Sequence, residues 1–387
     1  MADLFDRYRV IDMDTHVTEP PGVWTERVSK EWGDKIPHIR RMGPKDLWFV
    51  GDEPVGAPGA YSAAGHDGTY PDFRDTYEDI PKAAYDADAR LAMMDEEGIY
   101  AQVLYPNVGG FGSGRFLALD EPDLMLECVQ AYNDFLIQWC SADPARLIPV
   151  MALPFWDVSL SVKEIERSAA FGHRAILAGS QPQVFGQPLL RDRHWDPIWA
   201  AARDAGLPIS FHVGAGDLAE VVNDQANIGT KANFARASSC TFVENWQCIA
   251  DLIFGGVCHR FPEVDFVSVE SGAGWLYPML EMFDWQWVNS GVTDEHPEYD
   301  LMPSEYFRRQ IYGSFWFENE GLVKALELLP DNLMYETDYP HPTCMAPGPK
   351  SSAEPPRVYA EKALAGVPDE TLRKVLHDTA ARLYGIA

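Results

Sequence analysis

Short runs of apolar or β-branched residues alternate along this chain with longer segments in which apolar residues recur at helical spacing. Each short run predicts a buried strand. The eight runs lie at Arg9–Met13, Ala101–Tyr105, Leu147–Ala152, Arg174–Ala178, Pro208–His212, Val264–Glu270, Gln310–Phe317 and Asn332–Thr337. The helical segments lie around Ala83–Glu97, Asp123–Ser141, Val158–Ala170, Pro197–Ala205, Phe242–Gly255, Trp275–Val288 and Glu320–Leu329. Eight strands separated by helices predict an α/β fold, and a closed (β/α)8 TIM barrel suits this pattern better than an open sheet.

Two stretches interrupt the alternation of strands and helices. Residues 17–81, after the first strand, are rich in proline, glycine and aromatic residues and include the hairpin-like segment DLWFVGDEPV. Residues 289–308, before the seventh strand, contain two further prolines. We therefore predict one domain over residues 1–387 with two insertions, which are more often lids or oligomer contacts than linkers. Barrels of this type often associate through such segments, so a homodimer is an expectation by analogy.

Charge and cysteine content narrow the classes of partner. The chain carries 31 basic and 59 acidic residues, a net charge of −28, which excludes the broad basic surface that nucleic acids and anionic membranes require. The six cysteines have no CxxC spacing, which argues against a structural zinc site and favours a reducing, cytoplasmic setting. Neither a signal-peptide core nor an apolar run of about 18 residues occurs, so we expect no membrane span.

The sequence IDMDTH, at the end of the first strand, is the strongest local signal for chemistry. Side chains alternate along a strand, so Asp14 and His16 are expected to point to the same side. The active face of a barrel lies at the carboxyl ends of its strands, where this pair is found. A carboxylate and an imidazole form half of a site for zinc, iron or manganese. The alternative is a capping aspartate beside a hydrogen-bonded histidine.

Two other strand ends carry similar residues. His212 ends the fifth strand in LPISFHVGAG, and Asp338 and His341 follow the eighth in ETDYPHP. Each residue alone is as consistent with a structural role as with metal binding. Histidine or aspartate at three strand ends of one barrel, however, makes coincidence improbable. We therefore predict a metal site with Asp14, His16, His212 and Asp338 at its core.

With these motifs, most of the chain resembles the amidohydrolase-related (amidohydrolase 2) family, which contains aminocarboxymuconate-semialdehyde decarboxylase. The resemblance rests on Asp14-Thr15-His16, on His212, on the motif Asp338-Tyr339-Pro340-His341 and on the closing segment TAARLYGI. It implies a TIM barrel and a divalent metal but no single reaction.

The sequence departs from this family at the sixth strand. Many family members have a histidine there as general base, whereas this chain reads VDFVSVESGAGW, with Glu270 in that place. A carboxylate can act as a base, but it is also a good bridging ligand between two cations. The VESGAGW and ETDYPHP segments resemble the non-haem diiron monooxygenases of the same fold, whose relatives are expected to act on coenzyme A-linked substrates. That resemblance implies two iron ions, with Glu270 and His341 as additional ligands and catalytic residues.

Two functions therefore compete. The first is an O₂-dependent diiron monooxygenase that hydroxylates an acyl-CoA or a hydrophobic carboxylic acid, although the net charge of −28 opposes a polyanionic substrate. The second is hydrolysis, or non-oxidative decarboxylation of an aromatic or conjugated acid, at one zinc or manganese ion with Glu270 as base. We predict the first and keep the second as the alternative. In either case the substrate is a small molecule.

Two other glutamates are weaker candidates for a role at this site. Glu19, just past the first motif, is a candidate to orient His16 or to close the loop by hydrogen bonding. Glu244 precedes the sixth strand and is more readily interpreted as a solvated helix residue than as a further ligand.

Overall fold

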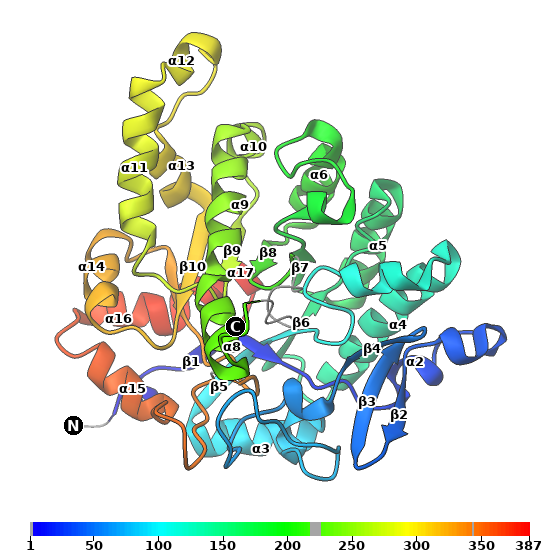
Figure 1. Ribbon diagram of the computed structural model, residues 1–387. Coiled ribbons are helices and arrows are strands. Elements are labelled where there is room, and N and C mark those ends of the chain that lie inside the picture. The colour runs from blue at the N-terminus through cyan, green and yellow to red at the C-terminus, as the bar shows by residue number, and fades with distance from the viewer. Residues whose placement is uncertain (1–2, 217–225, 343) are drawn as a thin grey trace.

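The computed structural model describes residues 3–216, 226–342 and 344–387 and contains a barrel of eight parallel strands (Figure 1). The strands follow one another around the barrel in chain order: β1 (Val10–His16), β5 (Ile99–Tyr105), β6 (Leu147–Met151), β7 (Ala175–Ala178), β8 (Ile209–His212), β9 (Phe266–Val269), β10 (Ile311–Phe315) and β11 (Leu333–Tyr335). Each lies within or next to a predicted run, so the predicted (β/α)8 barrel is confirmed.

The barrel is closed by contacts between the end of β1 and the segment that follows β11. Thr15 and Tyr339 form an isolated parallel bridge. The His16 N–H donates to the Tyr339 carbonyl at 2.7 Å, and the Asp338 N–H donates to the Asp14 carbonyl at 3.0 Å. Closure of the barrel therefore brings together the first and last motifs that the sequence singled out.

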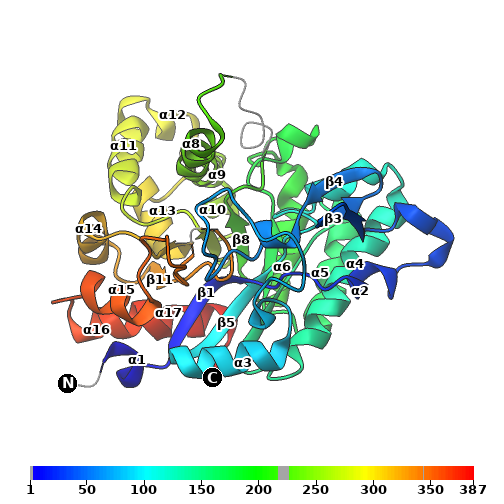
Figure 2. The ribbon, with the colours of Figure 1, turned by 60° about the horizontal axis from the view of Figure 1, so that its bottom comes forward.

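Helices cover the outside of the barrel in the order in which they follow the strands (Figures 1 and 2). Those with eight or more residues are α3 (Ala87–Glu97), α4 (Pro122–Cys140), α5 (Val158–Phe171), α6 (Asp196–Ala205), α8 (Thr230–Cys240), α9 (Phe242–Phe254), α11 (Leu276–Asn289), α13 (Pro303–Gln310), α14 (Glu320–Leu328) and α15 (Pro356–Ala363). Short helices are α1 (Leu4–Arg7), α2 (Gly22–Thr25), α10 (Val257–Arg260), α12 (Val292–Glu295), α16 (Asp369–Arg373) and α17 (Thr379–Tyr384).

Local sequence sets the ends of these helices. Helix α5 begins after Asp157, whose carboxylate accepts from the backbone N–H groups of Ser159 and Leu160, and it ends at Gly172 with φ +108°. Aromatic side chains then fill the layer between helices and strands: Trp199 of α6 makes edge contacts with Phe211 and Phe266 of the barrel.

The two stretches that interrupt the sequence pattern have ordered structure. Residues 17–81 contain an antiparallel sheet of β2 (His38–Met42), β3 (Lys45–Val50) and β4 (Glu53–Gly56), as the hairpin-like segment predicted. Residues 289–308 contain α12 and the start of α13, and with α11 they project from the barrel at the upper left of Figure 1. Helix α8 was not predicted. In the described parts of the chain, no helix is long and apolar enough to cross a membrane.

Candidate metal centre

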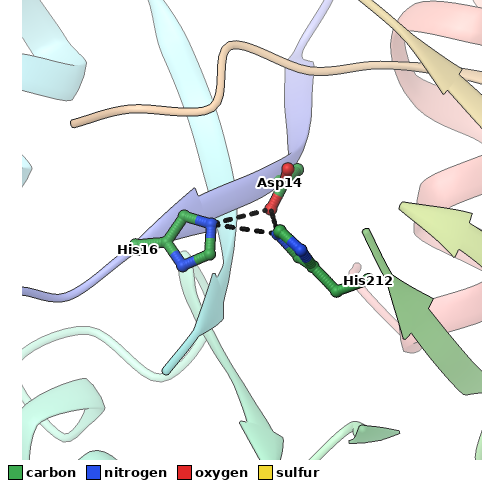
Figure 3. A group of neighbouring side chains, drawn as sticks. All are labelled: Asp14, His16 and His212. Atoms are coloured by element: carbon green, nitrogen blue, oxygen red, sulfur yellow. Dashed lines mark hydrogen bonds and ion pairs between the residues drawn. The ribbon is translucent and has the colours of Figure 1, made fainter. Parts of the chain in front are cut away.

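Six side chains from four parts of the barrel meet at the carboxyl ends of its strands. Asp14 and His16 lie on β1, and His212 ends β8; Figure 3 shows these three pointing toward one another. Glu270 follows β9 directly, and the segment after β11 supplies Asp338 and His341. The structure thus brings together all six residues that the sequence predicted.

The donor atoms of these side chains are close together. His16 Nε2 lies 3.5 Å from Asp14 Oδ1 and 3.5 Å from Asp338 Oδ1. His212 Nε2 lies 3.2 Å from His16 Nε2, 3.6 Å from Asp14 Oδ1 and 3.6 Å from Glu270 Oε2. Ligands that bind one cation at about 2.1 Å are separated from each other by roughly 3.0–3.4 Å in tetrahedral or octahedral geometry. The spacing of 3.2 Å between the two histidines falls in this range, and the spacings of 3.5 and 3.6 Å lie just above it.

Hydrogen bonds on the far side of each imidazole fix the tautomer of the three histidines. His16 Nδ1 donates to the Pro106 carbonyl at 3.1 Å, and His212 Nδ1 donates to the Val213 carbonyl at 2.7 Å. Both Nε2 atoms therefore present lone pairs to the centre, and they face each other. Two such lone pairs repel, and a cation between them converts the repulsion into attraction.

His341 has the opposite tautomer and the same consequence. Its Nε2 lies 2.6 Å from Asn107 Oδ1, and the amide nitrogen of Asn107 donates to the Val17 carbonyl at 2.8 Å. The Asn107 oxygen must then be the acceptor, so His341 Nε2 carries the proton. His341 Nδ1 is left with a lone pair 2.9 Å from Asp338 Oδ1, which is also an acceptor.

The carboxylates of the centre are held away from water and from donors. Asp14 and Asp338 are completely buried, and neither oxygen of either one accepts a hydrogen bond from the described residues. Burial, and then the neighbouring Asp12, raises the pKa of Asp14; burial, and then Asp14, raises the pKa of Asp338. A divalent cation supplies the positive charge that these two carboxylates lack. The donor set therefore fits a divalent metal ion.

Burial shifts the pKa values of Glu270, His16 and His341 toward the neutral forms of these groups. It raises the pKa of Glu270, with Asp338 as the second cause. It lowers the pKa of His16, and it lowers that of His341 to about 3. Neutral imidazoles are the form that binds a metal ion, so the environment favours ligation over protonation of these histidines.

The backbone is strained at two of the acidic residues. Glu270 has φ +53° and Asp338 has φ +56°, in the left-handed region that non-glycine residues seldom occupy. Such conformations cost of order 1–3 kcal/mol each and persist where the surrounding structure holds them. At Asp338 the holding contact is its N–H bond to the Asp14 carbonyl. At the loop after Glu270, the Glu318 carboxylate accepts from the N–H groups of Ala273 and Gly274, both at 2.7 Å.

A buried chain of polar contacts supports His341 from outside the cluster. Glu19 accepts from the backbone N–H groups of Asn107 and Val108 at 2.8 and 3.0 Å, and the Asn107 side chain holds His341. Glu19 thus closes the loop by hydrogen bonding, one of its two expected roles, and positions Asn107 rather than His16. The sequence reasoning missed Asn107, although its place two residues beyond β5 was a usable signal.

Replacing Asn107 with leucine should weaken metal binding without removing a ligand. The variant leaves His341 Nε2 without its acceptor, so the imidazole can rotate or change tautomer. Loss of such a supporting contact typically costs 10–100-fold in metal affinity. Competition with a chelator measures this constant, and Asn289→Leu, at an exposed position on α11, is the matched control. Equal affinities in both variants would show that Asn107 does not position His341.

A cavity of about 680 Å³ opens onto the cluster. Glu270, Asp338 and His341 form part of its lining, and Glu270 is the most accessible carboxylate of the cluster, with 18% of its side chain exposed. The rest of the wall is largely aromatic, with the rings of Tyr61, Phe111, Phe234, Phe242, Trp316 and Phe317. A flat, apolar substrate is therefore compatible with this space.

The remaining sequence candidates lie elsewhere. Glu244 is not a freely solvated residue: it is partly buried, and its carboxylate accepts from the Gly216 N–H at 3.3 Å beside the loop after β8. Three basic residues within six positions of the sequence, Arg40, Arg41 and Lys45, are on the small sheet, and each lies near an aspartate, at 4.0, 3.3 and 2.9 Å. They offer no free cluster for the phosphates of coenzyme A.

Comparisons with known proteins find similarity along most of the chain. The sequence pattern of the family described as Amidohydrolase matches residues 11–386. A gamma-resorcylate decarboxylase from Polaromonas sp. is 24% identical over 284 residues, which cover 71% of this chain and 81% of that protein. An amidohydrolase structure from Mycobacterium avium subsp. paratuberculosis superposes with a TM-score of 0.78 at 22% identity, covering 98% and 99% of the two chains.

A third relative was solved with a metal ion. This structure, a variant of 5-carboxyvanillate decarboxylase from Novosphingobium aromaticivorans with bound manganese, has a TM-score of 0.67 at 19% identity and covers 98% and 97% of the two chains. The predicted monooxygenase is wrong: the relatives with a named reaction are decarboxylases, which are lyases and not oxidoreductases. Two iron ions, O₂ and coenzyme A find no support, whereas a divalent metal does. The sequence signal for the monooxygenase was Glu270, whose role as a bridging ligand stays a prediction.

Proposed function

This chain belongs to the amidohydrolase family, and we propose that it is a metal-dependent decarboxylase that removes CO₂ from a hydroxylated aromatic acid without oxidation. The observation that carries the proposal is the cavity: an accessible carboxyl group, Glu270, stands between a cluster of metal-binding side chains and an aromatic wall. Such a space accepts a planar ring with its acidic end toward the cluster.

In this proposal Asp14, His16, His212 and Asp338 hold one divalent cation, zinc or manganese. His341 Nδ1 lies next to the same Asp338 oxygen and can complete the coordination. When bound, the cation supplies positive charge that anchors the carboxylate and phenolate oxygens of the substrate and stabilises charge that develops on the ring. The manganese in the 5-carboxyvanillate decarboxylase structure supports this choice of metal over iron.

Glu270 then serves as the acid that delivers a proton to the ring. Its proton passes to the ring carbon that carries the carboxylate, and a new C–H bond forms there. The bond between that carbon and the carboxylate carbon breaks, its electron pair returns to the ring, and CO₂ leaves. Overall, ArCO₂⁻ and H⁺ give ArH and CO₂, and solvent at the open side of the cavity returns a proton to Glu270.

Three features of the chain serve this step. The aromatic wall excludes water from the ring, and Phe111 stacks on His212 with centroids 4.0 Å apart, which fixes one side of the cavity. The left-handed backbone conformation of Glu270 ends the extended chain of β9 and fixes the position of its carboxyl group there. The hydrogen bonds to Pro106 and Val213 keep two imidazoles in one orientation. These contacts orient the reacting groups before the substrate arrives.

Hydrolysis is the second reaction that this cluster supports. The same Glu270 can accept a proton from a water molecule that attacks a carbonyl carbon, and the name of the matched family describes such chemistry. An ester or amide in place of a phenolic acid would then be the substrate.

A substrate panel separates the two reactions. Manganese-loaded protein is incubated with 2,6-dihydroxybenzoate, 5-carboxyvanillate and matched aryl esters and amides, and products are followed by chromatography and CO₂ release. We expect CO₂ and the ring-protonated product from at least one phenolic acid, with no uptake of O₂. Cleavage of an ester or amide, with every acid unchanged, would instead assign the chain to hydrolysis and contradict decarboxylation.

A further inference from the structure

One arginine stands in the wall of the cavity that opens onto the cluster. Among the described residues that line this cavity, Arg115 is the only lysine or arginine. It belongs to a short 3-10 helix, Gly114–Leu119, in the loop after β5. Its backbone N–H donates to the Gly109 carbonyl at 3.2 Å, and Ser113, two residues earlier, has φ +62°. The loop therefore holds this side chain in a defined place.

The guanidinium of Arg115 is held by neutral partners. Its Nη1 donates to the Tyr61 hydroxyl at 2.6 Å and to the carbonyls of Asn107 and Val108 at 3.3 and 3.5 Å. No carboxylate of the described residues pairs with it, although 59 of the 387 residues are acidic. All of these contacts use Nη1, so the N–H groups of the other two guanidinium nitrogens remain for a ligand.

The negative charge around the cavity makes the positive charge of Arg115 important for binding an acidic substrate. Asp14, Glu270 and Asp338 place three carboxyl groups at the end of the cavity, in a protein with a net charge of −28. An acidic substrate that enters this field is repelled unless a local positive charge compensates. One divalent ion offsets the charges of Asp14 and Asp338, and Glu270 carries a proton as the acid, so the cluster offers an acidic substrate no net positive charge. Arg115 supplies such a charge from the described wall of the cavity.

We propose that Arg115 binds a second acidic group of the substrate, one that keeps its charge through the reaction, and that the preferred substrates are therefore aromatic dianions. This inference rests on the proposed decarboxylase function. The group is a carboxylate or a comparable anion on the ring, at a position away from the carboxylate that leaves. Arg115 thus determines specificity and does not take part in bond breaking.

The chemistry of decarboxylation decides which acidic group Arg115 binds. The leaving carboxylate is already anchored by the metal ion and becomes neutral CO₂, so an arginine that also paired with it would stabilise the ground state further than the transition state and slow the reaction. An anion that survives into the product has the same charge before and after the step. An arginine that binds this surviving anion lowers KM and does not raise the activation barrier for CO₂ loss. A residue that serves substrate recognition should have this effect.

Ligand binding tests this subsite without any need for turnover. Calorimetry on manganese-loaded protein compares benzene-1,3-dicarboxylate with benzoate, which lacks the second anion. We expect the dicarboxylate to bind wild-type protein at least about tenfold more tightly, and Arg115→Met to abolish this difference. Arg115→Lys, which keeps the charge and loses the planar fork, should give an intermediate preference. Arg41→Met, on the small sheet, removes the same charge elsewhere and should leave the preference unchanged.

The outcomes distinguish this inference from the proposed function. A dicarboxylate preference equal in wild type and Arg115→Met, with both proteins folded by circular dichroism, overturns the role of Arg115 even if phenolic acids are decarboxylated. Loss of the preference in Arg115→Met supports the subsite even if no acid in the panel reacts. If Arg115→Met does not fold, the comparison of Arg115→Lys with wild type decides, and an unchanged preference there overturns the proposal. For turnover, Arg115→Met should raise KM for 5-carboxyvanillate and leave kcat nearly constant.

Discussion

Replacing His212 with alanine should abolish activity and most of the metal binding. The imidazole supplies one of the two Nε2 lone pairs that face each other across 3.2 Å, and no other described nitrogen takes its place between Asp14 and Glu270. The metal contributes several kcal/mol to stabilising the transition state, so we expect turnover to fall by about a thousandfold or more. Metal content after gel filtration, measured by mass spectrometry, should fall in parallel.

A buried histidine outside the cluster provides the matched control. His173 is 2% exposed, and its Nδ1 bonds to the Ser168 carbonyl at 3.1 Å. His173→Ala should lower stability through lost packing yet keep the wild-type metal content. If the His212 variant keeps its metal and activity, or if the two variants lose metal equally, the cluster is not the metal site.

Replacing Glu270 with glutamine should remove the acid and keep the metal. Glutamine has nearly the same shape but no transferable proton, so turnover should fall by about 10²–10⁴-fold, the usual contribution of a general acid. The four core ligands named above are unchanged in this variant, so its metal content should stay near that of wild type. Glu327→Gln, at an exposed pair with Lys324 on α14, is the control for loss of one acidic charge.

The metal content of this variant also tests the bridging role that the sequence suggested for Glu270. A protein that loses one of two metal ions on Glu270→Gln would show a dinuclear centre and contradict the assignment of this residue as an acid. Full activity with full metal content would show that Glu270 neither binds metal nor transfers a proton.

Much of the fold was predictable because its signals are local. A buried parallel strand needs a short apolar run, and each of the eight runs produced one, with ends displaced by only a few residues. The meeting of the six candidate side chains was also predictable, since each lies at or near the carboxyl end of a strand, where a barrel places its chemistry.

What the sequence could not provide depends on contacts between distant segments. Asn107 acts through His341, which lies 234 positions away, and Arg115 reaches the cavity through a loop with an unusual backbone at Ser113. Neither residue type is distinctive by itself. The reaction was mispredicted for a related reason. A glutamate has the right chemistry for a bridging ligand, and the exposure of Glu270 to the cavity, which favours a role as an acid, is seen only in the structure.

A crystal of the protein grown with manganese would locate the metal through its anomalous scattering. We expect one strong peak per chain, bounded by Asp14, His16, His212 and Asp338, with Glu270 facing the open side of the cavity. A peak elsewhere in the barrel, or none at saturating manganese, would contradict the metal centre. Two peaks of equal height, bridged by Glu270, would contradict the single-ion mechanism.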